Sequence, residues 1–274
     1  MSEIHTIGSL FSGIGGLELG LELALDAETL WQVEQNPFCL RVLEKHWPQA
    51  KRHTDVRTVG ASVVPEVDLV CGGFPCQDVS SAGRQVGLSG ARSGLWCEFA
   101  RIVDEIKPKA VVVENVVGLL QAKGGGIGAV LGPLAELGYD AFWTCLSASD
   151  FGASHRRRRV FVVAWKAMAN AYNLRKQQRT KAVGSKAGRR NSHCSGRQAQ
   201  PGVARSFDGF SRWVDASGSV ARWGKPQHDW EPPRTIEGFS PEKQGRMRAL
   251  GNAVVPRVSY CVGRLLAKIL EAQS

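Results

Sequence analysis

The chain lacks the cysteine patterns that are typical of disulfide frameworks and zinc sites. Its seven cysteines are odd in number, scattered, and never spaced as Cys-x-x-Cys. Secreted disulfide-rich domains and structural zinc sites usually show regular cysteine spacing. We therefore expect a reducing compartment, free thiols and no bound metal.

Long apolar runs are missing as well. No apolar segment of the signal-peptide kind follows the first residues, and no stretch approaches the ~18 continuous apolar residues that a membrane span needs. A cytoplasmic protein that does not bind membranes is expected. With 274 residues, 43% of them hydrophobic, the chain can form one large globular domain, or one domain with a smaller second lobe.

Acidic residues are nearly absent from one segment. Between Lys166 and Val214 there are eleven basic residues and a single acid, Asp208, so this segment carries the whole formal charge of +10. The rest of the chain is formally neutral. Such a concentration of positive charge is expected to meet a phosphate backbone, although a solvated tail has the same composition.

A cysteine stands at the tip of a sharp turn. The apolar run Val67–Cys71 has the length of a buried strand, and two glycines and a proline then turn the chain before Cys76. Open α/β sheets hold their ligands at the carboxyl ends of the strands, so Cys76 is a candidate nucleophile. A small buried side chain in a loop is the competing interpretation.

A glycine-rich loop lies near the start of the chain. Thr6–Phe11 predicts a strand, Ser12-Gly13-Ile14-Gly15-Gly16 a loop, and the apolar positions from Leu17 a helix. Glycines let the backbone approach a ligand, and N–H groups at a helix start can bind a carboxylate or a phosphate. The next strand, Leu30–Val33, ends in Glu34, about twenty residues further on, where nucleotide-binding units place an acid for the ribose hydroxyls.

Two further features follow Glu34. A helix is predicted from Pro37, a favourable first-turn residue, with His46 on its buried face. The pair Thr54-Asp55 then stands at a predicted strand end. Its side chains could bind an adenine amino group or simply cap a turn, and the residues leave both interpretations open.

An acid and an arginine run complete the candidate chemistry. Ala110–Val113 predicts an apolar strand that delivers Glu114 at its carboxyl end. If this strand neighbours the one before Cys76, the carboxylate is a second catalytic group; otherwise it caps the next helix. Strands predicted at Tyr139–Leu146 and Val160–Ala164 flank the four arginines 156–159, some of which must face an anion or a carboxylate.

In this order, the motifs resemble those of the cytosine-5 DNA methyltransferase family. Phe11-Ser-Gly-Ile-Gly-Gly is similar to its cofactor loop, Gly72-Gly-Phe-Pro-Cys-Gln to its nucleophile loop, Glu114-Asn-Val to its acid motif, and Leu250-Gly-Asn-Ala-Val to its C-terminal motif. The resemblance runs from Ile7 to about Ala164 and resumes from Arg246 to Leu270.

The resemblance implies an α/β fold: a Rossmann-like, doubly wound, mostly parallel sheet of the class I methyltransferase type with a small, irregular second lobe. The expected domains are 1–165 for catalysis and cofactor binding, 166–245 as a basic target-recognition lobe, and 246–274 as a segment whose helix returns to the first domain. The layout is compact, as in phage and prophage members.

The same resemblance implies a DNA (cytosine-5-)-methyltransferase that moves a methyl group from S-adenosylmethionine to a flipped-out cytosine through a covalent Cys76 adduct. The implied catalytic residues are Cys76, Glu114, Arg157 and Arg159. The implied cofactor-binding residues are Phe11, Gly13, Gly15, Gly16, Glu34, Asp55 and Asn252. We expect a monomer that acts on double-stranded DNA, with a cognate restriction endonuclease as a further candidate partner.

The chain departs from the family pattern at two places. His155 stands where the family has glutamine, while Arg157 and Arg159 occupy its arginine positions, and no clear copy of the arginine-rich helix precedes the C-terminal motif. Two rival functions stay open. One is a tRNA cytosine-5 methyltransferase on the same scaffold, and the other is a catalytically inactive DNA-binding relative.

Overall fold

A twisted sheet forms the centre of the computed structural model, which describes residues 4–75, 94–122, 126–153, 155–166 and 241–273. Its strands are β1 (Thr6–Leu10), β2 (Glu28–Val33), β3 (Lys51–His53), β4 (Leu69–Gly72), β5 (Ala110–Val116), β6 (Tyr139–Ser147) and β7 (Arg158–Lys166). They lie in the order β3-β2-β1-β4-β5-β7-β6. The first five strands pair in parallel, and β7 runs antiparallel to both of its neighbours.

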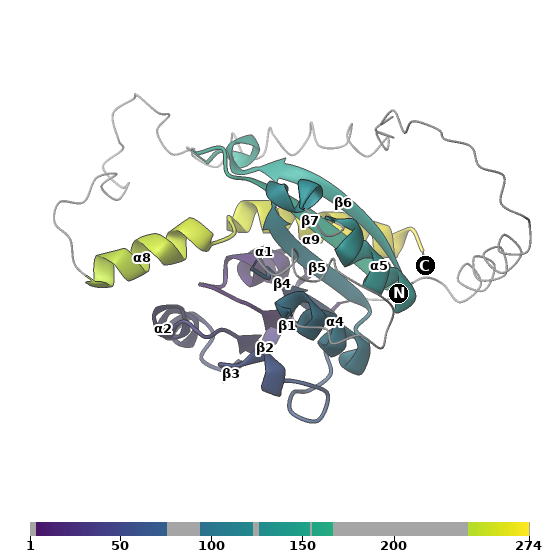
Figure 1. Ribbon diagram of the computed structural model, residues 1–274, viewed down its shortest axis with the longest axis horizontal. Helices are drawn as coiled ribbons and strands as arrows, with labels where there is room; N and C mark the ends of the chain where they lie inside the picture. Colours follow the sequence, from purple (N-terminus) through teal and green to yellow (C-terminus); the bar gives the residue numbers. More distant parts are fainter. Residues whose placement is uncertain (1–3, 76–93, 123–125, 154, 167–240, 274) are drawn as a thin grey trace, which may run out of the picture.

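Helices cover both faces of this sheet (Figure 1). They are α1 (Gly16–Leu25), α2 (Pro37–His46), α4 (Leu95–Ile106), α5 (Gly128–Glu136), α8 (Pro241–Asn252) and α9 (Pro256–Glu271), with short 3-10 helices η1 (Val56–Thr58), η3 (Val117–Gln121) and η4 (Ala148–Phe151). The predicted α/β fold with a mostly parallel sheet is confirmed. The predicted second lobe lies almost wholly outside the described residues.

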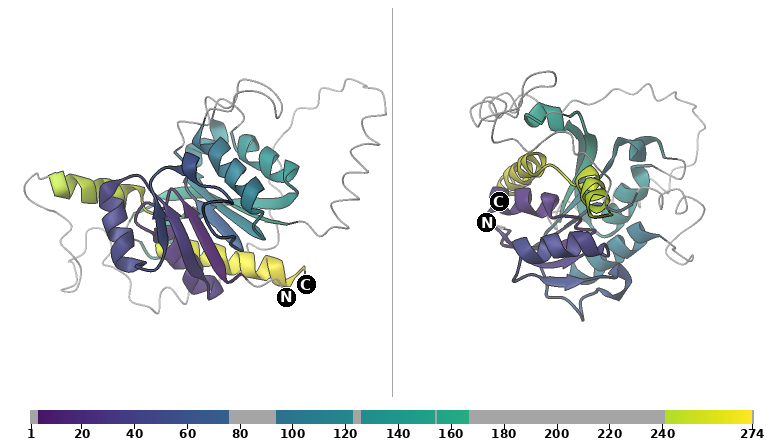
Figure 2. Two further views of the ribbon diagram at one scale, coloured as in Figure 1. Left: turned by 90° about the horizontal axis from the view of Figure 1, so that it is seen from below. Right: turned by 90° about the vertical axis from the view of Figure 1, so that its left-hand side faces the viewer.

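On one face of the sheet, α1 and the C-terminal helix α9 lie side by side (Figure 2). Their apolar side chains share a buried cluster with Ile7 of β1 and Leu69 of β4. The helices approach closely because glycines lie at the contact: a Cβ at Gly20 would lie 2.1 Å from Oγ of Ser259, and one at Gly263 would lie 2.5 Å from Cβ of Ala24. The Ser259 hydroxyl of α9 also donates a hydrogen bond to the carbonyl of Gly16 at 2.9 Å. Helix α9 is thereby held against the start of α1, next to the glycine loop.

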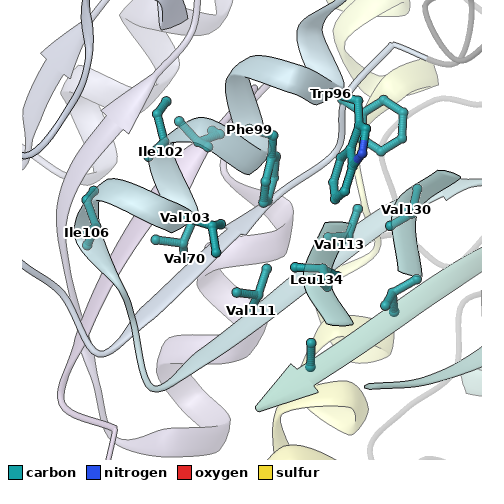
Figure 3. Packing of buried hydrophobic residues seen from close by; sticks show 14 of the residues in the cluster. Val70, Trp96, Phe99, Ile102, Val103, Ile106, Val111, Val113, Val130 and Leu134 are labelled. Atoms are coloured by element: carbon teal, nitrogen blue, oxygen red, sulfur yellow. The ribbon is translucent and has the colours of Figure 1, made fainter. Parts of the chain in front are cut away.

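On the opposite face, α4 and α5 cover the second buried cluster. In α4 the apolar residues recur at helical spacing, and Figure 3 shows Phe99 and Val103 packed over Val70 and Val111 of the sheet. The helix stops after Ile106. The next residue, Lys107, has a left-handed φ of 54° and is followed by Pro108, and a residue before proline disfavours the helical conformation. Helix α4 begins at Leu95, one residue after the described part of the chain resumes.

Two details differ from the sequence-based predictions. His46 is exposed rather than buried, because Cys39 and Leu43 form the buried side of α2. The strand predicted to end before Glu114 continues to Val116, so Glu114 lies inside β5, and the competing helix-cap interpretation does not apply. Helix α8 starts at Pro241 and includes residue 245, and the domain bounds stay a prediction. Among the described residues, no helix is long and apolar enough to cross a membrane.

Candidate active site

A cleft of about 730 Å³ opens where β1, β2, β4 and β5 end. The carboxyl ends of neighbouring parallel strands meet at one edge of a sheet, so residues far apart in the sequence converge there. The predicted site residues that line the cleft are Phe11, Gly13, Glu34, Asp55, Glu114, Arg157, Arg159 and Asn252. Gly15 and Gly16 lie beside it, and Cys76 lies outside the described residues.

The glycine loop takes its shape from close packing. Gly15 has a φ of 83°, and a Cβ there would lie 2.3 Å from the ring of Trp47. At Gly16, a Cβ would lie 2.1 Å from the carbonyl oxygen of Val254. A larger residue at either position would have to displace the ring or the backbone. The loop can therefore start α1 directly at the cleft, where the first N–H groups of the helix are available.

Glu34 ties the glycine loop to the start of α2. One carboxylate oxygen accepts the N–H of Gly13 at 2.8 Å, and the other accepts the N–H of Asn36 at 2.7 Å. Each oxygen keeps a lone pair, so the carboxylate can still accept hydroxyl groups from a ligand in the cleft.

Asp55 caps η1 on the same side of the cleft. It accepts the backbone N–H of Arg57 at 3.0 Å and the side-chain Nε of that arginine at 2.9 Å. Its side chain is partly exposed, and the hydrogen bonds to Arg57 lower the pKa of the carboxyl. Of the two interpretations that the sequence left open for Asp55, the capped turn is present, and the position in the cleft wall leaves a ligand contact possible as well.

Glu114 is the buried acid on the opposite side. Its Oε1 lies 3.0 Å from Nε of Arg159 in an ion pair, although the N–H direction does not make a hydrogen bond, so this oxygen keeps its capacity to bond a ligand. Burial raises the pKa of the Glu114 carboxyl, and the nearby positive charges of Arg159 and Arg157 oppose that rise. The site therefore contains a carboxyl that binds a proton more readily than an exposed one.

The backbone that leads to Cys76 is fixed next to Glu114. Strands β4 and β5 are parallel neighbours, as the catalytic interpretation of Glu114 requires. The buried side-chain amide of Asn115 donates to the carbonyl of Phe74 at 2.9 Å, two residues before the cysteine. At Gly73 a Cβ would lie 2.9 Å from Oε2 of Glu114, so the carboxylate rests against bare backbone. Gly73 and Phe74, which directly precede Pro75 and Cys76 in the sequence, are thus held beside the acid.

The arginine run divides its side chains between two tasks. Arg159 pairs with Glu114, whereas Nη1 of Arg157 donates a hydrogen bond to the carbonyl of Gly251 at the end of α8. Burial and the charge of Arg159 lower the pKa of Arg157. Arg156 and Arg158 are exposed, as is His155 at the family's glutamine position. The prediction that some of these arginines face a carboxylate therefore holds for Arg159.

Helix α8 corrects one statement drawn from the sequence. It does carry arginines, Arg246 and Arg248, ahead of Gly251 and Asn252, so a basic helix does precede the C-terminal motif. It was missed because its apolar residues show almost no one-sided pattern, and Met247 and Leu250 are exposed. Arg248 and the residues from Asn252 to Val254 line the cleft.

Sequence reasoning also missed Glu18. This acid in the first turn of α1 is fully buried and lines the cleft together with Ser9 and Ser12. A signal was present, since Glu18 stands among the apolar residues of the helix face that carries Leu17 and Leu21. Among the described residues, no cluster of three or more His, Cys, Asp or Glu side chains could hold a metal ion.

Comparison with known proteins points to one family. The family model for C-5 cytosine-specific DNA methylases matches residues 5–194. Type II methyltransferase M1.ScrFI of Lactococcus lactis subsp. cremoris is 33% identical over 157 residues, which are 57% of this chain and 40% of that protein. Type II methyltransferase M.HhaI of Haemophilus parahaemolyticus is 33% identical over 166 residues, or 60% of this chain and 50% of that protein.

A solved structure agrees with these matches. A prophage-encoded E. coli protein, described as a DNA modification methyltransferase, is 27% identical in sequence over the aligned region at a TM-score of 0.50. The alignment covers 59% of this chain and 47% of that protein's chain. The chain thus matches half or less of the length of each of these three relatives.

Proposed function

The chain belongs to the C-5 cytosine-specific DNA methylase family, and from this premise we propose that it transfers a methyl group from S-adenosylmethionine to C5 of a cytosine in DNA. One observation carries the proposal: the buried Glu114, paired with the half-buried Arg159, shares a single cleft with the glycine loop and Glu34. One side of the cleft suits a base and the other an adenosyl cofactor.

The base side supplies the activation that cytosine needs. Position C5 is not nucleophilic, so the Cys76 thiolate adds to C6 while Glu114 gives a proton to N3, and electron density moves to C5. Transfer of the methyl group to C5 leaves the donor as the neutral thioether S-adenosylhomocysteine. A water molecule then takes the C5 proton while the S–C6 bond breaks, which restores the aromatic ring and the thiolate. The proton on N3 returns to Glu114, which completes the cycle.

The electrostatics of Glu114 suit proton transfer. Burial raises the pKa of its carboxyl above the ordinary value, while the charges of Arg159 and Arg157 oppose that rise. General acids work best when their pKa lies near the working pH. Arg159 also fixes the direction of the carboxyl and, as a charged donor in the cleft wall, is available to the base oxygen.

The cofactor side fits S-adenosylmethionine, which when bound supplies an electrophilic methyl group. The cleft volume of about 730 Å³ falls within the ~300–1,000 Å³ range of small-molecule sites. Glu34 would hold the ribose hydroxyls, Asp55 the adenine, and the glycine loop with Phe11 and Asn252 the remaining part. A Cβ at Gly13 would meet no atom within 4 Å, so this turn faces space that a ligand can fill.

The burial of Glu114 restricts how a cytosine can reach it. The residue lines the cleft and is 8% exposed, so a cytosine stacked in a duplex cannot contact it, and the base must leave the stack. We assign duplex DNA as the substrate and the segment 166–245 as its target-recognition lobe, supported by the +10 charge between Lys166 and Val214.

Methyl transfer to different nucleic acids tests the proposal. Purified protein and tritium-labelled S-adenosylmethionine are incubated with duplex DNA or with tRNA, and bisulfite sequencing locates the product. Label at C5 of cytosine in DNA, absent with Cys76→Ser, supports the proposal. Label in tRNA alone would replace the DNA substrate by an RNA one, and binding of DNA without any methylation would indicate an inactive relative.

A further inference from the structure

Glu18 is a carboxylate in an environment that should be unfavourable for one. It lies in the first turn of α1 with no exposed surface, and neither carboxylate oxygen has a hydrogen-bond partner of good geometry among the described residues. Burial raises the pKa of the Glu18 carboxyl to about 7, and the hydroxyls of Ser9 and Ser12 only partly oppose this. Burying an acid without a partner destabilises a fold, so the presence of Glu18 at this position indicates a functional role.

The surroundings of Glu18 form a polar layer within an otherwise apolar face. Ser9 pairs in register with Gln32 on one side and with Cys71 on the other, so these three side chains form one row beneath α1. The Ser12 hydroxyl donates to that of Ser9 at 2.9 Å. Ser12, which is 9% exposed and lines the cleft, connects this layer to the ligand space.

The other acids of the cleft wall already have partners. Among the described lining residues, Glu34 accepts two backbone N–H groups, Asp55 binds Arg57, and Glu114 is paired with Arg159. Of these four described acids, only Glu18 has neither a cation nor the N–H group of another residue as a partner. An ammonium group placed near the start of α1 would provide the missing positive charge.

We propose that Glu18, with the hydroxyls of Ser9 and Ser12, receives the ammonium group of the amino-acid part of S-adenosylmethionine. The inference rests on the proposed function, since that function supplies the ligand. An amino acid carries a carboxylate and an ammonium on one carbon. The free N–H groups at the start of α1 suit the carboxylate, and Glu18 in the same turn suits the ammonium, so both charges are matched at one helix end.

A purely structural role for Glu18 makes a different prediction. A glutamine has the same shape and no charge to bury, so it should be tolerated or even preferred where a carboxyl only fills space. If the negative charge serves a ligand, the glutamine variant folds well and loses affinity only for ligands that carry the ammonium group.

Calorimetric titration with two ligands separates these possibilities. S-adenosylhomocysteine keeps the ammonium and carboxylate, whereas 5′-methylthioadenosine keeps the adenosine and the sulfur but lacks both. We expect Glu18→Gln to weaken S-adenosylhomocysteine binding by about tenfold or more, as for a lost hydrogen bond to a charged group, and to change 5′-methylthioadenosine binding by less than about twofold.

Glu22→Gln is the matched control. Glu22 lies one turn further along α1, accepts the N–H of Thr29 and the indole N–H of Trp47, and does not line the cleft. It should leave the ratio of the two affinities unchanged. Equal S-adenosylhomocysteine binding by wild type and Glu18→Gln, or an equal loss of both ligands, would overturn the inference alone. Wild type that binds neither ligand would overturn the proposed function together with it.

Discussion

The two sides of the cleft are built on different physical principles. On the cofactor side, backbone and packing make the site: glycines against Trp47 and Val254, and N–H groups held by Glu34. On the base side, charges make the site: the guanidinium of Arg159 pairs with the carboxyl of Glu114, and burial raises the pKa of that carboxyl. Added side-chain volume on the cofactor side should therefore lower the stability of the fold. Altered charge or nucleophilicity on the base side should lower the rate of methylation and leave the fold intact.

The largest expected effect is on the base side. Cys76→Ser should abolish turnover while cofactor affinity is kept, because an alcohol is a far poorer nucleophile than a thiolate near neutral pH. Tritium transfer and calorimetric binding measure the two properties. Cys145→Ser, a half-buried cysteine of β6, is the control and should methylate normally. Substantial methylation by Cys76→Ser would remove Cys76 from the role of nucleophile.

Glu114→Gln comes next on the same side. It keeps the shape of the buried side chain but cannot deliver the proton, and groups of this kind contribute about 10²- to 10⁴-fold in rate. Single-turnover methylation should slow by that factor with the melting temperature nearly unchanged. Glu105→Gln, which alters a partly exposed acid bonded to Arg101 on α4, is the control. An unchanged rate for Glu114→Gln would leave Glu114 a structural residue.

Gly16→Ala tests the packing of the cofactor side. The added methyl would lie 2.1 Å from the carbonyl oxygen of Val254, so α1 and the chain before α9 would have to separate. Overpacking of this kind costs about 1–3 kcal/mol in the free energy of unfolding. Urea denaturation measures it. Gly132→Ala in α5, where a Cβ would meet no atom within 4 Å, should show no loss; equal stability of the two variants would contradict the packing argument.

Glu18 is the exception on the cofactor side, because there a charge is buried. Its pKa in the folded protein, about 7, lies above the ordinary 4.5, so its stabilising contribution is complete below about 4.5 and is lost as the pH rises to about 7. Glu18→Gln should match wild type near pH 4.5 and exceed it by about 3 kcal/mol above pH 7. The buried thiol of Cys71 does not interfere, since burial raises its pKa well above the ordinary value.

Denaturation across this pH range, with Glu22→Gln as the control, measures the difference. A constant difference at all pH values would show that the Glu18 carboxyl is not perturbed. A variant that is more stable yet binds S-adenosylhomocysteine more weakly would show a stability cost that serves binding.

The sequence predicted the local features of both sides and missed their cross-connections. The apolar run before Glu34 located this acid correctly, directly after the end of β2, because strand length and a change of polarity are local signals. The run before Glu114 located the strand, but β5 continues past the acid to Val116. The bond from Arg157 to Gly251 spans 94 residues, and no spacing rule contains it. Glu18 was missed because an acid on a helix is usually exposed, although its position among the apolar residues of α1 was a signal that it is buried.

The smallest expected effect concerns Arg157, which connects the two sides. It belongs by sequence to the arginine pair of the base side, has an unusual φ of 26°, and donates to the carbonyl of Gly251, next to the cleft residue Asn252. The bond should hold the end of α8 against the cleft.

Arg157→Ala should therefore weaken cofactor binding about tenfold, the effect of one lost hydrogen bond to a charged group, and leave the single-turnover rate at saturating cofactor within about threefold. Arg159→Ala should do the reverse, because its partner is Glu114. Arg156→Ala, which changes an exposed neighbour, is the control for general loss of positive charge. If Arg157→Ala lowers the rate and spares cofactor affinity, Arg157 acts on the base side, and the two sides are not connected through Gly251.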